Sequence, residues 1–246
     1  MTAPPLARET EFGREYYNFR TQERAPSITS ILKVINKEQV NSWAVGMAAG
    51  YANENWDEMA DWHPAQRKEA MVSAHEEYTS ERARIGTLVH ETCEAIIKGI
   101  PVEVPKEAAS YVGQFGKFVM ERRPRFTHSE VTVWSRTLGY AGTADIIMEV
   151  NGSTVLADIK TGKNAHPENG LQLAALKYAD FIIDPDCGEH EIPPIDHLAV
   201  LHLRPRGWKV IPIAGERECF QAFCAALELF RWKDEVADHV LMQVAA

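Results

Sequence analysis

The sequence predicts an α/β (α+β) fold, in which a central mixed β-sheet is flanked by helices and preceded by helical additions. Two mostly apolar runs at residues 139–150 and 154–160 flank an Asn-Gly pair, which is a strong short-range signal for a β-hairpin. Residues 26–123 are expected to be mainly helical, and the first of their helices shows a three-to-four apolar spacing at Ile28, Ile31, Leu32 and Ile35. Residues 216–240 carry an amphipathic helical pattern after the predicted strands.

The length of 246 residues is sufficient for one large core, so we expect a single domain over residues 1–246. Within it, residues 1–10 are expected to be a flexible arm, residues 26–123 mainly helical, and residues 124–246 the sheet core with a C-terminal helix. Apolar residues make up 45% of the chain and charged residues 25%, which are the values of an ordinary globular protein.

Several elements can be placed more closely. The expected helices cover residues 28–35, 40–53, 64–78, 80–99, 106–122, 167–183 and 216–240, and further strands cover residues 12–19 (an edge strand), 126–136, 197–203 and 208–213. Ser27 or Thr29 is expected to cap the first helix. For Trp43, Trp56 and Trp62 we expect core packing, with stacking on a nucleic-acid base as the alternative.

The predicted hairpin carries two aspartates and a lysine. Asp145 lies in its first strand and Asp158 at the end of its second, so a tight turn brings them close together. Lys160 follows Asp158 at a spacing of two and projects from the same face of the strand. Two carboxylates and an ammonium suit a divalent cation that activates water beside a phosphate. The alternatives are a surface ion pair for Asp158 with Lys160 and a capping role for Asp145.

These residues belong to motifs that resemble a known family. The Gly-Thr-Ala-Asp segment ending at Asp145 and the Asp-Ile-Lys-Thr-Gly segment starting at Asp158 resemble the second and third motifs of the PD-(D/E)XK nuclease superfamily, in its RecB-like exonuclease branch. The Gly-Thr-Leu-Val-His segment ending at His90 resembles that branch's histidine motif, and Gln172 lies in a segment that resembles its glutamine-bearing helix. The Pro-Ser-Ile-Thr-Ser-Ile-Leu segment from Pro26 resembles one found in phage-encoded members. The resemblance covers about residues 12–182 in the family's order.

The resemblance implies a restriction-endonuclease-like core and a Mg²⁺- or Mn²⁺-dependent deoxyribonuclease. It implies metal ligation by His90, Asp145, Asp158 and the backbone carbonyl of Ile159. It also implies catalytic roles for Asp145 and Asp158, for Lys160 on the attacking water or the phosphate charge, and for Gln172 in organising the site. A tyrosine that often follows the glutamine by four residues is replaced here by Leu176, and Tyr178 points to a different face.

Two further acids are candidates for accessory roles. Glu94 lies one turn after His90 on the same helical face, and Glu130 lies in the strand next to the hairpin. A surface ion pair is the alternative for Glu94, and a solvent-facing strand position is the alternative for Glu130.

The net charge of −9 argues against a general nucleic-acid coat, although acidic metal ligands count as negative until a cation binds them. A DNA-binding stripe would therefore be local. The candidate cations are Arg82, Arg84, Lys117, Arg122, Arg123, Arg125 and Lys163, and the alternative is that they are solvated helix faces.

The four cysteines and the absence of a signal peptide or an apolar membrane span predict a cytoplasmic protein with reduced thiols, in the host cytoplasm if the chain is phage-encoded. The His90–Cys93 and Cys187–His190 spacings are compatible with zinc, but His90 has the role described above. An iron–sulfur cluster is not expected, because Cys187, Cys219 and Cys224 lack the tight C-terminal grouping of cluster-binding relatives.

Together these features predict a DNA exonuclease acting in recombination or DNA end processing. The expected partner is DNA, with a recombination or single-strand annealing protein as a second candidate and no membrane. A structure-specific endonuclease of the junction-resolvase type is the nearest alternative. A non-catalytic DNA- or partner-binding protein on the same fold belongs to a different class, and such a module has no need of the full set of site residues.

Overall fold

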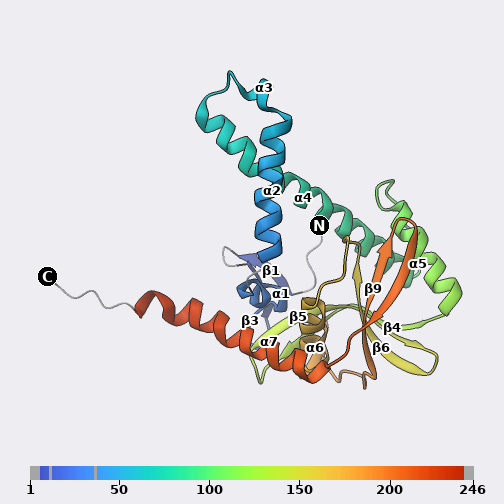
Figure 1. The fold of residues 1–246 in the computed structure, drawn as a ribbon. Coiled ribbons are helices and arrows are strands. Elements are labelled where there is room, and N and C mark those ends of the chain that lie inside the picture. The colour runs from blue at the N-terminus through green and yellow to red at the C-terminus, as the bar shows by residue number, and fades with distance from the viewer. Residues whose placement is uncertain (1–5, 11–12, 36–37, 241–246) are drawn as a thin grey trace. The chain divides into compact units, whose positions relative to one another are not determined.

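The computed structural model describes residues 6–10, 13–35 and 38–240 (Figure 1). The chain divides into two compact units, one formed by residues 1–35 with 89–246 and the other by residues 36–88. The sequence did not indicate this division. In the described part of the chain, no helix combines the length and apolar character needed to cross a lipid bilayer.

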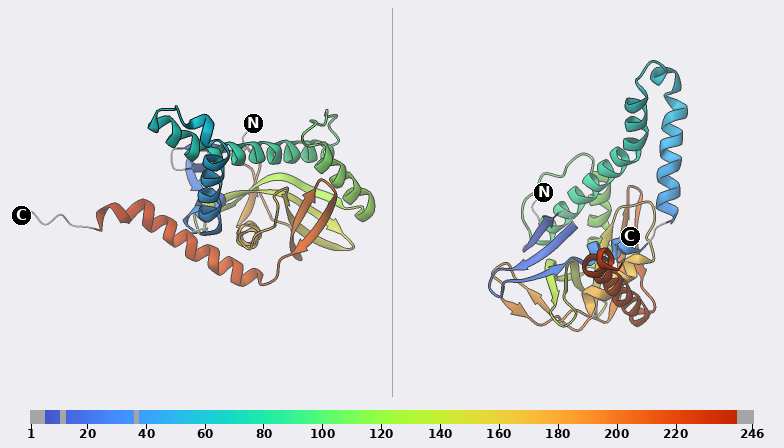
Figure 2. Two further views of the ribbon diagram at one scale, coloured as in Figure 1. Left: turned by 45° about the horizontal axis from the view of Figure 1, so that its top comes forward. Right: turned by 90° about the vertical axis from the view of Figure 1, so that its left-hand side faces the viewer.

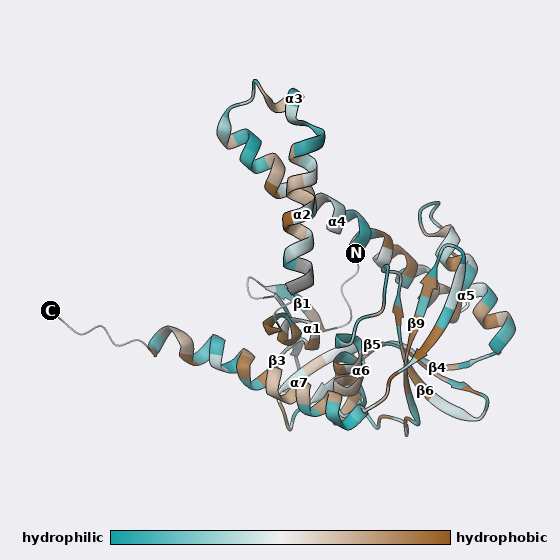
Figure 3. Cartoon of the chain, in the orientation of Figure 1, coloured by the Kyte–Doolittle hydropathy of each residue, from teal (hydrophilic) through white to brown (hydrophobic). Residues whose placement is uncertain are grey.

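The first unit contains a mixed seven-stranded sheet, which confirms the predicted fold class. Its strands are β4 (Arg125–Ser135), β5 (Tyr140–Val150), β6 (Ser153–Lys160), β7 (Phe181–Ile183), β8 (Glu189–His190), β9 (His197–Arg204) and β10 (Gly207–Pro212). The strand order is β10-β9-β6-β5-β4-β7-β8, and all neighbours are antiparallel except the parallel pair β6–β9. Most residues of β9 are apolar (Figure 3), as is typical of a strand that is buried inside a sheet.

Helices cover both faces of this sheet (Figure 2). Helices α6 (Glu168–Lys177) and α7 (Glu216–Arg231) pack on one face, where Ile211 of β10 joins their apolar cluster. Trp208 lies three residues before Ile211 in β10, so its side chain points to the opposite face of the sheet. There its ring centroid lies 5.3 Å from that of Phe118 in α5 (Ala109–Arg122). The layered arrangement buries β5, β6 and β9 from both sides.

The β5–β6 hairpin is confirmed. Asn151 and Gly152 both have positive φ, at 52° and 80°, which is what a two-residue type I′ turn requires. The predicted strands on either side of the 205–206 turn are also confirmed, as β9 and β10.

The N-terminal region differs from its prediction. The strands β1 (Ala7–Thr10), β2 (Gly13–Asn18) and β3 (Glu23–Pro26) form a separate three-stranded sheet. Residues 7–10 of the expected flexible arm are therefore a strand, whereas residues 1–5 lie outside the described residues. The prediction that residues 12–19 form an edge strand is wrong, because β2 pairs on both sides. The polar sequence of β1 has no apolar alternation that would reveal its pairing.

The three-stranded sheet is attached to the central one. The buried Tyr16 hydroxyl lies 2.7 Å from Thr143 Oγ1 of β5. Ser27 forms a β-bridge with Ala141 and caps the short helix α1 (Ile28–Ile31), as its Oγ accepts a hydrogen bond of 3.0 Å from the Ser30 N–H. A 3₁₀ turn, η1 (Leu32–Val34), follows.

The second unit is helical. It contains α2 (Glu38–Glu54), α3 (Trp56–Met59) and the first part of α4 (Pro64–Ile97). The prediction of two helices with a break near residue 79 is wrong. The Thr79 hydroxyl donates to the carbonyls of His75 and Glu76 in the preceding turn of the helix. Its side chain therefore does not draw the backbone out of its helical hydrogen bonds. The predicted core packing is also wrong for Trp43 and Trp56, whose side chains are exposed.

The glutamine-bearing helix is shorter than predicted. It ends at Lys177, and residues 181–183, assigned to its last turn, form β7 and pair with β4. The Phe-Ile-Ile sequence of β7 has a high propensity for strands. Pairing with β4 makes this segment a strand in place of the last helical turn. The C-terminal helix likewise ends early, at Arg231, and continues as the π-helical turn η2 (Trp232–Val236) and the 3₁₀ turn η3 (Ala237–His239).

The core between the central sheet and α7 depends on Phe223. Its side chain is fully buried, and its ring lies 4.9 Å from that of Tyr140 in an edge-to-face arrangement. Replacing it by alanine should lower the free energy of unfolding by about 3–5 kcal/mol, since the lost contacts leave a cavity. Chemical denaturation measures this change. Leu229→Ala, at a half-exposed position of the same helix, is the control and should change it by less than about 0.5 kcal/mol. Equal effects of the two changes would contradict the assigned core.

Candidate metal centre

The strand register brings the two hairpin aspartates together. The pairing of Ile146 with Ala157 places the next positions, Asp145 and Asp158, opposite each other on β5 and β6. The Ile159 N–H donates a hydrogen bond of 2.7 Å to Asp145 Oδ2, which fixes that carboxylate against the end of β6. Both aspartates come from central strands of the sheet.

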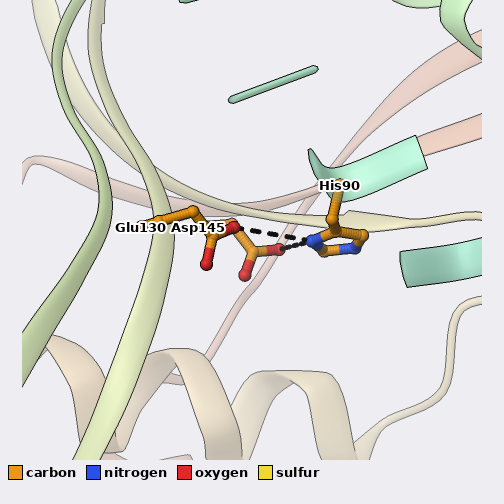
Figure 4. Close-up of side chains that lie close together, drawn as sticks. All are labelled: His90, Glu130 and Asp145. Carbon is orange, nitrogen blue, oxygen red and sulfur yellow. Dashed lines mark ion pairs between the residues drawn. The ribbon is translucent and has the colours of Figure 1, made fainter. Parts of the chain in front are cut away.

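The imidazole of His90 faces the acids from α4 (Figure 4). Its Nδ1 lies 3.5 Å from Asp145 Oδ2 and 3.7 Å from Glu130 Oε1 of β4. One ligand atom from each of the three residues lies within 4.8 Å of the others, so that one metal ion could contact all three. A residue of α4 therefore meets two acids from the consecutive strands β4 and β5, which lie about 40 residues or more further along the chain.

The backbone of Ile159 contacts two members of this group. Its carbonyl oxygen lies 2.8 Å from His90 Nε2, while its N–H binds Asp145. The sequence assigned this carbonyl to a cation. In the structure it is the partner of Nε2, and a hydrogen bond of that kind orients a ligating imidazole and leaves its other nitrogen free.

Asp158 is the most buried charged residue of the site, with only 2% of its surface exposed. Its Oδ1 accepts hydrogen bonds from Lys160 Nζ at 2.9 Å and from Gln172 Nε2 of α6 at 3.1 Å. Its Oδ2 lies 2.8 Å from Lys160 Nζ but accepts no hydrogen bond from any described residue. The Lys160 ammonium is thus the cation that this buried carboxylate contacts through both of its oxygens.

The charges of the site influence one another strongly. Burial lowers the pKa of His90, but the Asp145 and Glu130 carboxylates outweigh it and raise that pKa to about 9. Burial raises the pKa of Asp158 to about 6 despite the neighbouring Lys160 ammonium, and it also raises the pKa of Asp145. Removing these carboxylates from water is therefore costly, and an added positive charge would offset that cost.

Glu130 has an unusual backbone. Its φ is +50°, in the left-handed region, although it lies between residues 129 and 131 that pair regularly with β5. A non-glycine residue in that region costs about 1–3 kcal/mol and is found preferentially at functional sites. From the sequence, Glu130 was either an accessory residue of the site or a solvent-facing strand residue. In the structure its carboxylate lies beside His90.

Glu94, the other accessory candidate, lies elsewhere. Its carboxylate pairs with Lys98, which directly follows the end of α4, and it is not in the three-residue group. Among the described residues, no cysteine belongs to the three-residue group. The His90–Cys93 and Cys187–His190 spacings form no second group of possible metal ligands there. Leu176 is part of the core, and the Tyr178 ring packs 4.7 Å from Phe220.

Sequence reasoning missed two residues that hold the loop after Lys160. His202 Nε2 lies 2.8 Å from the Gly162 carbonyl oxygen. Arg204 Nη1 donates to the same oxygen at 2.5 Å and approaches the Thr161 carbonyl at 3.4 Å. Both side chains come from β9, whose parallel pairing with β6 has no local sequence signal.

Comparisons with known proteins add little. No family model matches the chain, and no curated protein matches it. The crystal structure of SSO0001 is similar over 82% of each chain, with 14% sequence identity and a TM-score of 0.34. A similarity at that TM-score carries no argument about fold family or function.

Proposed function

We propose that this protein is a Mg²⁺- or Mn²⁺-dependent DNA exonuclease that hydrolyses phosphodiester bonds in recombination or DNA end processing. In this proposal it is a RecB-like member of the PD-(D/E)XK superfamily with a restriction-endonuclease-like core. The observation that carries the proposal is the convergence of His90, Glu130 and Asp145 beside a buried Asp158 that is paired with Lys160.

The donor set fits a hard divalent cation. Carboxylate oxygens with a single imidazole suit Mg²⁺ and Mn²⁺, whereas zinc and iron–sulfur sites prefer thiolates or several imidazoles. His90, Glu130 and Asp145 would hold the cation, with Asp158 Oδ2 as the next oxygen available. When bound, it would lower the pKa of a water molecule and neutralise charge on the scissile phosphate.

The chain's own residues then have distinct tasks. Lys160 keeps its ammonium on the face that bears Asp158, where it stabilises negative charge that develops on the phosphate oxygens. Gln172 holds Asp158 Oδ1 and so fixes the direction of Oδ2. The Ile159 carbonyl sets the orientation of the His90 ring. We further propose a cytoplasmic location and a recombination or single-strand annealing protein as a partner.

The test is digestion of end-labelled linear duplex and single-stranded DNA, with a closed circle as the control. With Mg²⁺ or Mn²⁺ the labelled ends should be released as small products, while the closed circle stays intact and a chelator stops the reaction. Cutting of the circle would favour the endonuclease alternative. If neither cation supports release of the label, the proposed function is wrong.

A further inference from the structure

Two loops lie together at the end of the sheet that bears Lys160. Strands β6 and β9 are parallel, and their register pairs Lys160 with His202. β9 continues to Arg204 before the turn into β10, so this turn emerges beside the loop at residues 161–166. The contacts of His202 and Arg204 with the Gly162 carbonyl join the two loops directly.

Both loops are basic in an acidic protein. Residues 161–166 include Lys163, and residues 204–209 include Arg204, Arg206 and Lys209, while neither segment contains an aspartate or glutamate. Lys163, Arg206 and Lys209 are exposed, and within the described part of the chain none of the three forms an ion pair. Three unpaired cations and no acid therefore make this end of the sheet locally positive in a chain of net charge −9, and a local positive surface attracts a negatively charged partner.

The register also sets where these cations point. Lys209 pairs with His202, which pairs with Lys160, so the three side chains share one face across β10, β9 and β6. Neighbouring strands are about 4.8 Å apart, which puts Lys209 roughly 10 Å from Lys160 along this row. The row leads from the candidate metal centre to the edge strand of the sheet.

We propose that Lys163, Arg204, Arg206 and Lys209, here called the basic hairpin surface, hold the phosphate backbone of a nucleic-acid strand next to the phosphate at the metal centre. This proposal rests on the proposed function and names the part of the chain that grips its substrate. A cation at the centre contacts one phosphate, and a positive surface nearby would attract the neighbouring phosphates of the same strand. Contacts to phosphate position a strand without reading its sequence, as a non-specific exonuclease requires.

The test is the salt dependence of binding to a fluorescent single-stranded oligonucleotide in Ca²⁺, with intact strands verified on a gel. The variant Arg206→Gln/Lys209→Gln removes two charges from the surface. Arg20→Gln/Lys233→Gln removes the same two residue types at exposed positions on other elements and is the matched control. Each phosphate contact on a single strand contributes about 0.7 to the magnitude of the slope of log K against log salt concentration. The slope of the test variant should therefore be smaller in magnitude by about 1.4, and its affinity at 0.1 M salt should be about 25-fold lower.

The outcomes separate the two proposals. A weaker affinity and smaller slope in the test variant, with the control close to the parent, support the surface. If the test variant matches the control while the parent binds and digests DNA, the surface is wrong and the nuclease proposal stands. If the parent neither binds the strand nor digests DNA in Mg²⁺ or Mn²⁺, both proposals are wrong.

Discussion

Replacing Asp158 by asparagine is expected to abolish DNA hydrolysis by the metal-loaded protein. Asparagine has nearly the same shape, and its carbonyl still accepts the hydrogen bonds that Lys160 and Gln172 donate to Oδ1. The change removes the negative charge and replaces Oδ2 by an amide NH₂ group, so the carboxylate that suits a divalent cation is lost. Deleting one charge-stabilising donor already costs about 10²–10³-fold in kcat, so losing a buried carboxylate beside the metal should cost more than about 10³-fold.

Thermal unfolding of the same variant separates chemistry from folding. Asp158 is 2% exposed, and burial raises its pKa to about 6, so its charge destabilises the folded protein when no metal is bound. The metal-free variant should therefore unfold at the same or a higher temperature than the metal-free parent. Near-parental hydrolysis by a well-folded Asp158→Asn protein would remove Asp158 from the mechanism.

Replacing Lys160 by glutamine is expected to separate catalysis from metal binding. The substitution keeps a hydrogen-bond donor near Asp158 but removes the charge that would stabilise the phosphate oxygens, so kcat should fall by about 10²-fold. Affinity for Mn²⁺, measured by calorimetry, should stay the same or rise, because the ammonium repels an incoming cation.

Lys160→Arg is the matched control, since it restores the charge with a different geometry. Its rate should lie between those of the parent and Lys160→Gln. A glutamine variant that loses Mn²⁺ affinity in parallel with its rate would instead make Lys160 a structural support of the site.

The sequence predicted the part of the site that depends on local rules. The Asn151–Gly152 turn fixes the register of its hairpin, and that register alone brings Asp145 opposite Asp158. The spacing of two between Asp158 and Lys160 likewise places both on one face of a strand. Such inferences need only the period of a strand and the geometry of a turn.

Contacts between distant segments could not be predicted in the same way. The strained backbone of Glu130 exists because neighbouring strands hold it, and nothing in its own segment indicates a positive φ. His202 and Arg204 reach the loop after Lys160 only because β9 pairs in parallel with β6. β7 was assigned to a helix for the same reason, because its strand structure depends on β4.

The central claim is that His90, Glu130 and Asp145 bind one cation beside Asp158. Crystals grown with Mn²⁺ and measured near the manganese absorption edge test this most directly, because the anomalous signal locates the ion itself. The account predicts a peak about 2.0–2.3 Å from the His90 nitrogen and the carboxylate oxygens of this group. A peak at another site, or an ordered centre with no peak at saturating Mn²⁺, would contradict it.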